Sequence, residues 1–255
     1  MRSSSPPLIV LAALLPALVL CACRAPAPPP DAARTARATR PELLALRADW
    51  GTCDALSFER AVDALPPDGG LLDERDLAHL GAALGRSDPV ALRAAILLGR
   101  SADPRAGRAL LARLEARDYD RERHADAADV VAAASLAGWA FAPDVPARLA
   151  ALAVGARPHE DIEVRVECAA SALAFGRDEV APFLLRVLRS QTPAELEDPP
   201  DWETKRTMAW SKARAALALS ARAGVPCSFD PDASYADQRA ETERLARLLG
   251  PGAGS

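Results

Sequence analysis

Three stretches of the chain repeat one residue pattern at a spacing close to 37 residues. They are SDPVALRAAILLGRSADPRAGRALLARL (87–114), ADVVAAASLAGWAFAPDVPARLAAL (128–152) and DIEVRVECAASALAFGRDEVAPFLLRVL (161–188). A leucine recurs at one place in every stretch, with spacings of 38 and 37 residues: Leu98, Leu136 and Leu173. A second leucine recurs with spacings of 38 and 36 residues: Leu114, Leu152 and Leu188. Two independent positions that keep nearly the same period predict a repeat protein.

Each repeated stretch has the pattern of two amphipathic helices joined by a tight turn. Asp88-Pro89 and Asp103-Pro104 place a capping side chain directly before a proline at the first helical position. Three further aspartates are expected to cap later helices: Asp144, Asp161 and Asp178. Alanines at inward positions are expected to let neighbouring helices approach closely: Ala94, Ala95, Ala132, Ala133, Ala169 and Ala172. One such pair cannot bury its apolar face alone, so the pairs must stack.

This pattern resembles the HEAT repeat and its phycobilisome-lyase-like relatives. The first unit carries the likeness in these residues: Asp88, Arg93, Leu98, Gly99, Asp103, Pro104, Leu111 and Leu114. The third unit carries it in these: Val164, Arg165, Ala169, Ala170, Leu173, Gly176, Asp178, Leu185 and Leu188. The second unit departs from the pattern, because Val131 stands near the place of the first-helix arginine. The resemblance covers residues 70–190 and is only moderately specific, since TPR-like hairpins share much of it. It implies an all-α fold, a right-handed α-solenoid of stacked antiparallel helix pairs.

The regions that flank the repeats at 87–190 are expected to cap the stack. Residues 41–86 form an N-terminal helical cap, with helices predicted over 41–49, 54–65 and 73–86. An acidic, proline-rich insertion, QTPAELEDPPDW (191–202), opens a C-terminal cap that extends to residue 250. That cap contains two helices, near 203–222 and over 235–249. The last helix is expected to turn three leucines toward the stack: Leu245, Leu248 and Leu249.

Residues 1–22 have the pattern of a bacterial export signal. The basic Arg2 precedes an apolar run over 8–20, which is shorter than the about 20 residues that span a bilayer core. The sequence LCAC at 20–23 resembles the lipobox of bacterial lipoproteins, which implies lipid attachment at Cys23, with Cys21 as the alternative. A cleaved signal for soluble secretion is the other reading. The chain is therefore expected to be exported and lipid-anchored to a bacterial membrane, and 23–40 is expected to be a disordered tether rich in Pro, Ala and Arg.

Composition argues against nucleic acid as a partner. The chain has 31 basic and 35 acidic residues, and only Arg2 of the basic residues precedes Cys23, so the net charge from Cys23 onward is −5. Such a chain has no long-range attraction for a polyanion. Four arginines of the tether leave contact with anionic lipid headgroups open as an alternative: Arg24, Arg34, Arg37 and Arg40.

Three cysteines follow the proposed anchor, and an odd number cannot pair completely. Cys168 lies among valines and alanines of a helical segment and is expected to be a small core residue. Cys53 and Cys227 are the only plausible disulfide pair, and whether they form one stays open.

The sequence shows no convincing catalytic constellation. It lacks a G-x-S-x-G nucleophile turn, a Walker-type phosphate loop and a G-x-G-x-x-G motif. A zinc site needs three or four converging ligands, and no two of the histidines, His79, His124 and His159, lie four residues apart on one helix. They are expected to be exposed loop or helix-cap residues. No catalytic residue, cofactor or metal is therefore predicted. Trp139 and Trp210 are expected to pack, while for Trp50 and Trp202 exposed anchoring is an alternative.

These observations favour a non-enzymatic scaffold for protein–protein interactions, tethered to a membrane of the bacterial cell envelope. Two alternatives stay open: an enzyme or enzyme accessory of the HEAT-like lyase type, and a purely structural envelope lipoprotein. Guanidinium groups pair with carboxylates and are favoured at interfaces, so a partner surface is expected at three arginines of the second helices: Arg108, Arg113 and Arg186. The expected partner is a protein or peptide that carries acidic groups.

Overall fold

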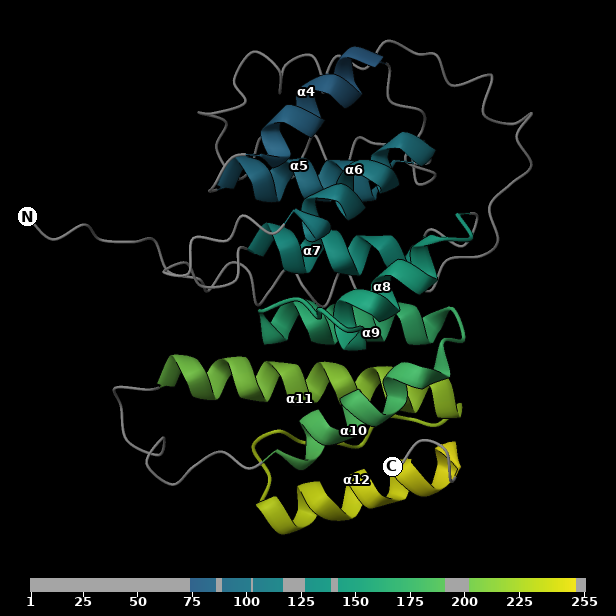
Figure 1. The fold of residues 1–255 in the computed structure, drawn as a ribbon. Helices are drawn as coiled ribbons and strands as arrows, with labels where there is room; N and C mark the ends of the chain where they lie inside the picture. Colours follow the sequence, from purple (N-terminus) through teal and green to yellow (C-terminus); the bar gives the residue numbers. More distant parts are fainter. Residues whose placement is uncertain are drawn as a thin grey trace, which may run out of the picture.

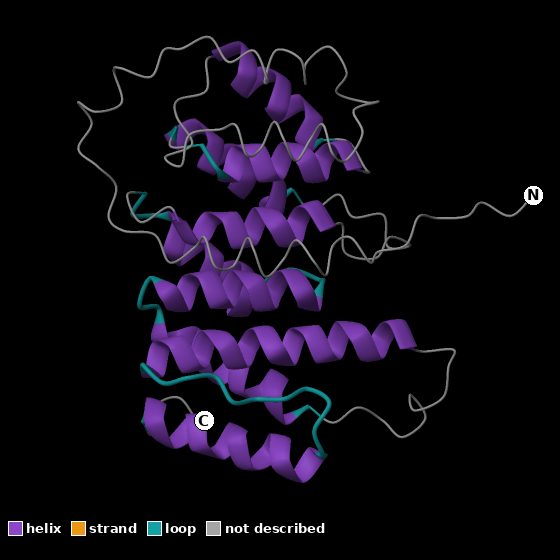
Figure 2. Ribbon diagram, turned by 180° about the vertical axis from the view of Figure 1, so that it is seen from behind, coloured by secondary structure: helices purple, strands orange, loops and turns teal. Residues whose placement is uncertain are grey.

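The computed structural model describes residues 74–85, 89–101, 103–116, 127–138, 142–190 and 202–250. All regular structure in these ranges is helical, and none of it is strand (Figure 2). The prediction of an all-α chain is confirmed for this part of the molecule. The export signal, the tether with Cys23, and the helices expected over 41–49 and 54–65 lie outside the described residues.

The described residues form nine α-helices. In chain order they are α4 (Glu74–Leu84), α5 (Pro89–Gly99), α6 (Pro104–Glu115), α7 (Ala127–Ser135), α8 (Val145–Val154), α9 (Ile162–Ala174), α10 (Ala181–Arg189), α11 (Trp202–Ala223) and α12 (Tyr235–Leu249). Two short 3-10 helices extend this series, η2 (Leu136–Gly138) after α7 and η3 (Asp178–Val180) before α10. Each predicted unit therefore contains two helices: α5 with α6, α7 with α8, and α9 with α10.

The first helices of the units pack against one another in sequence order. α5 contacts α7, α7 contacts α9, and α9 contacts α11, so these helices follow one another along the long axis of the molecule (Figure 1). α8 also packs against α9, and α10 against α11. α4 covers α5 and α6 at one end, while α12 packs on α10 and α11 at the other.

The buried positions follow the repeat. All six repeated leucines are buried: Leu98, Leu136, Leu173, Leu114, Leu152 and Leu188. The six alanines expected to face inward are buried as well, and Cys168 is a core residue as predicted. Gly99 shows why small residues are needed, because a side-chain carbon at this position would overlap the side chain of Ser135 on α7. The close approach of α5 and α7 therefore depends on a glycine.

Aspartates cap two of the helices for which capping was predicted. Asp103 accepts a hydrogen bond from the backbone N–H of Arg105 at 2.8 Å, with proline at the first position of α6. Asp161 accepts bonds from the backbone N–H groups of residues 163 and 164 at the start of α9. These side chains satisfy backbone donors that have no partner inside the helix.

Two of the other capping predictions are wrong. Asp144 stands at the N-cap of α8 but makes no capping bond, and its carboxylate accepts a bond from Arg148 at 3.3 Å instead. Asp178 lies inside η3, and its carboxylate pairs with Arg222 of α11. In both places the carboxylate accepts a hydrogen bond from an arginine side chain instead of from backbone N–H groups at the helix start. Asp88 lies outside the described residues.

The C-terminal helix differs from the prediction at one leucine. Leu245 is fully buried, and Leu249, four residues later on the same face, packs against the core. Leu248 is 50% exposed instead of facing the stack. It lies beyond the strip of α12 that α10 and α11 cover, at the edge of an open cleft.

Candidate functional site

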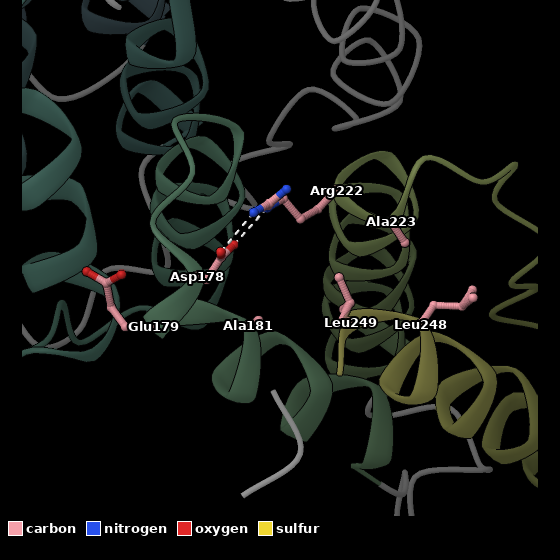
Figure 3. Close-up of a pocket in the computed structure, with 7 residues that line it drawn as sticks. All are labelled: Asp178, Glu179, Ala181, Arg222, Ala223, Leu248 and Leu249. Atoms are coloured by element: carbon pink, nitrogen blue, oxygen red, sulfur yellow. Dashed lines mark hydrogen bonds and ion pairs between the residues drawn. The ribbon is translucent and has the colours of Figure 1, made fainter. Parts of the chain in front are cut away.

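An open cleft of about 450 Å³ lies where the start of α10, the end of α11 and the end of α12 meet (Figure 3). Four apolar and three charged residues line it: Ala181, Ala223, Leu248, Leu249, Asp178, Glu179 and Arg222. The exposed Leu248 gives the cleft an apolar side chain that nothing in the described part of the chain covers fully. This combination suits a ligand that presents an apolar group next to a charged one.

The charged side of the cleft is a bidentate ion pair. Arg222 donates from Nε and Nη2 to the two carboxylate oxygens of Asp178, at 2.7 and 2.8 Å (Figure 3). The hydrogen bond from Arg222 lowers the pKa of the Asp178 carboxyl. The side chain of Asp178 remains 61% exposed and that of Arg222 42% exposed. Because water reaches both groups, either can exchange its partner for a charged group of a ligand at little cost.

Two buried carboxylates elsewhere in the stack are paired with arginines. Glu167 of α9 accepts two bonds from Arg214 of α11, both 2.6 Å long. Asp129 of α7 accepts a bond from Arg113 of α6 at 2.5 Å, and the same arginine also donates to the backbone carbonyl of Leu84. These pairs connect successive units, and their carboxylates are almost completely removed from water. We assign them a role in holding the helices in register.

The three arginines expected to form a partner surface are not equivalent. Arg113 is turned inward to Asp129, so it is a structural residue and the expectation of a surface position is corrected. Arg108 on α6 and Arg186 on α10 are exposed. They belong to different units, the first and the third, and the fold does not bring them into one constellation with Arg113. The sequence could not separate these roles, because the carboxylate that pairs with Arg113 lies 16 residues away.

The histidines and cysteines do not assemble a metal site in the described ranges, where no group of three or more His, Cys, Asp and Glu side chains could hold an ion. His79 is exposed on α4, while His124 lies outside these ranges. His159 is buried, contrary to the expectation of an exposed residue. Its Nδ1 accepts the backbone N–H of Asp161 at 3.1 Å, which builds the turn between α8 and α9. Cys227 is exposed and free, and Cys53 is outside the described residues.

The burial of one lysine was not predicted from the sequence. Lys212 of α11 is buried, and its Nζ donates to the Gln238 side-chain oxygen at 3.0 Å and lies 6.0 Å from the centre of the Tyr235 ring. Burial lowers the pKa of this ammonium group. The one hint in the sequence was the rarity of lysine, because the chain has only two lysines, Lys205 and Lys212, among its many arginines.

The tryptophan predictions are tested at one position. Trp210 is partly buried and packs against the hydrophobic core, as expected. Trp50 and Trp139 lie outside the described residues.

No helix in the described part of the chain is both long and apolar enough to cross a membrane. Comparison with protein families, curated proteins and solved structures finds no match for the chain.

Proposed function

We propose that this chain is a lipid-anchored, non-enzymatic binding module of the bacterial cell envelope, built as a right-handed HEAT-like α-solenoid. The burial of equivalent leucines in three successive units supports the repeat, as does the packing of α5, α7, α9 and α11 in order. Repeats that contact only their neighbours form extended surfaces, and such surfaces serve recognition.

The observation that carries the binding function is the cleft between α10, α11 and α12. It joins an exposed leucine to an exposed, exchangeable ion pair. An apolar group beside a charged one is what a short segment of a protein partner presents. The expected partner is therefore a protein or peptide, and the chain would reach it while tethered to the membrane.

Three carboxyl groups of the described part, one of them in the cleft, are unsuited to act as a general acid. The pKa is lowered at three carboxyl groups of the described part: Asp103, Asp178 and Glu241. At Asp178 and Glu241 a hydrogen bond from a neighbouring arginine has the largest effect. At Asp103 burial raises the pKa, but the bonds from Arg105 outweigh it. A catalytic acid needs a pKa raised toward neutral pH, so these carboxylates are unsuited to donate a proton.

The anchor rests on the sequence LCAC at 20–23. Cys23→Ser should abolish labelling with radioactive palmitate and release the protein from membranes, whereas Cys21→Ser should leave both unchanged. Retention of the Cys23→Ser protein in the membrane fraction would overturn the anchor assignment.

Site-specific photocrosslinking in membranes tests the binding function. A photoreactive amino acid placed at Leu248 should give a discrete protein adduct, because this side chain borders the cleft. The same amino acid at Ala147, which is exposed on α8 away from the cleft, is the matched control. Equal yields at the two positions, or no adduct at Leu248, would contradict a binding cleft and favour a purely structural lipoprotein.

A further inference from the structure

Two contacts hold the side chain of Arg165 on α9, but no carboxylate of the described residues neutralises its charge. Its Nε donates to the backbone carbonyl of Ala153 at the end of α8, at 3.1 Å. Its guanidinium carbon lies 4.7 Å from the centre of the Phe183 ring on α10. The two contacts fix a long side chain that is half-buried. No carboxylate in the described ranges pairs with it, and its terminal nitrogens have no acceptor there.

Arg186 lies beside this guanidinium. It follows Phe183 by three residues on α10, so the two side chains are neighbours on one face of the helix. Arg186 is exposed, and no acidic side chain of the described residues forms an ion pair with it. Burial, and after it the charge of Arg186, lower the pKa of Arg165. Two adjacent like charges, one of them partly removed from water, destabilise the fold unless an anion joins them.

Many other arginines of the described residues have a carboxylate partner. Eight described arginines form ion pairs with aspartate or glutamate at the surface or between helices: Arg105, Arg113, Arg148, Arg177, Arg189, Arg214, Arg222 and Arg244. A carbonyl at the C-terminus of α8 explains the position of Arg165, because cations stabilise that end of a helix. It does not explain why Arg186 stands next to it without a carboxylate.

We propose that Arg165 and Arg186 form a binding site for side-chain carboxylates of an acidic segment in the protein partner. A planar guanidinium pairs with a carboxylate through two parallel bonds, as Arg222 does with Asp178 in this molecule. The net charge of −5 from Cys23 onward opposes binding of dense polyanions such as nucleic acid. A short acidic segment carries less charge and gains the two-bond geometry. This site rests on the proposed binding function and names the chemistry of the partner.

Peptide binding to the full-length lipidated protein in a neutral detergent tests the site. The probe is a fluorescent 12-residue peptide of alternating Gly and Glu, and its counterpart with Gln in place of Glu is the reference. The wild-type protein should bind the Glu peptide and not the Gln peptide. Arg186→Gln should weaken binding of the Glu peptide about tenfold, the effect of losing one charge-assisted pair. Arg239→Gln, which removes a similarly exposed arginine of α12, should change the affinity less than about twofold.

The following outcomes would overturn the site or separate it from the cleft. Equal weakening by Arg186→Gln and Arg239→Gln would show that only net charge matters. Stronger binding of a phosphoserine peptide, or of vesicles with phosphatidylglycerol, would mean that the arginines serve another anion. Crosslinking at Leu248 without binding of the Glu peptide would leave the proposed function intact and remove this site. Arginine-dependent binding of the Glu peptide without that crosslink would keep the site and remove the cleft.

Discussion

Helix α11 carries two arginine–carboxylate pairs with the same geometry in opposite surroundings. Arg214 donates two bonds to Glu167, both 2.6 Å long, and Arg222 donates two bonds to Asp178, of 2.7 and 2.8 Å. The side chain of Glu167 is 1% exposed and that of Arg214 is 15% exposed. For Asp178 and Arg222 the corresponding fractions are 61% and 42%. Judged by bond length alone, the two pairs would be expected to contribute equally to stability.

The difference in burial separates structure from recognition. The inner pair, Arg214 with Glu167, lies between α9 and α11, where both charges are mostly removed from water and depend on each other. The outer pair lies at the cleft, where water already solvates both groups and the attraction between them adds little. The inner charges therefore hold the helices in register, and the outer charges are available to a ligand.

The largest effect on stability is expected when the carboxylate of the inner pair, Glu167, is removed. Glu167→Ala should lower the free energy of unfolding by about 3–5 kcal/mol, because it leaves the Arg214 charge buried without a partner. Chemical denaturation followed by circular dichroism at helical wavelengths measures it. Replacement of both residues by methionine should recover most of the loss, since no charge then remains inside. A single variant that loses less than about 1 kcal/mol would contradict the assignment of Glu167 as a buried structural charge.

Two leucines, one buried and one exposed at the cleft, test the same difference in burial without charge. Leu173→Ala should cost about 2–5 kcal/mol, because this side chain is fully buried in the core and its removal leaves a cavity. The same magnitude is expected at Leu98 and Leu136. Leu248→Ala, at the cleft, should change stability by less than about 0.5 kcal/mol. Thermal melting of the two variants compares them, and a large loss at Leu248 would mean that it is a packing residue after all.

Two glycines, one in a tight helix contact and one in open space, should respond differently to replacement by alanine. Gly99→Ala should destabilise the protein by about 1–3 kcal/mol, because the new methyl group overlaps Ser135 across the contact of α5 and α7. Gly81→Ala is the matched control on α4, where an added methyl group meets nothing. It should stabilise the protein by up to about 1 kcal/mol through helix propensity. Similar stability of the two variants would contradict the close approach of α5 and α7.

The smallest effect is expected at the outer ion pair. Because the pKa of Asp178 is lowered in the folded protein, its stabilising contribution is present above the pKa of an unfolded aspartate, about 3.9. It is lost as the pH falls through the lower pKa of the folded state. Asp178→Asn should therefore lower the melting temperature slightly at pH 7, and molar salt should remove that difference. The difference should shrink as the pH falls through the lowered pKa of Asp178. A large loss at pH 7 would mean that the pair is structural.

Local sequence patterns were sufficient for the helices and much of the core. The helices predicted over 73–86, near 203–222 and over 235–249 correspond to α4, α11 and α12, and the repeated leucines are buried as expected. Helical spacing and Asp-Pro caps act within a few residues, so they can be read directly from the chain. The capping bonds of Asp103 and Asp161 follow from the same short range.

Only the tertiary structure decided the role of each charge and of each marginal apolar residue. Arg113 pairs inward with Asp129, while Arg186 stays at the surface beside Arg165, and no local pattern distinguishes the two. The inner and outer pairs of α11 join residues 47 and 44 positions apart. Leu248 was expected in the core and borders an open cleft, because the helices around it end there. Burial depends on which distant segments pack around a side chain, and it is burial that makes one ion pair structural and leaves the other free to bind.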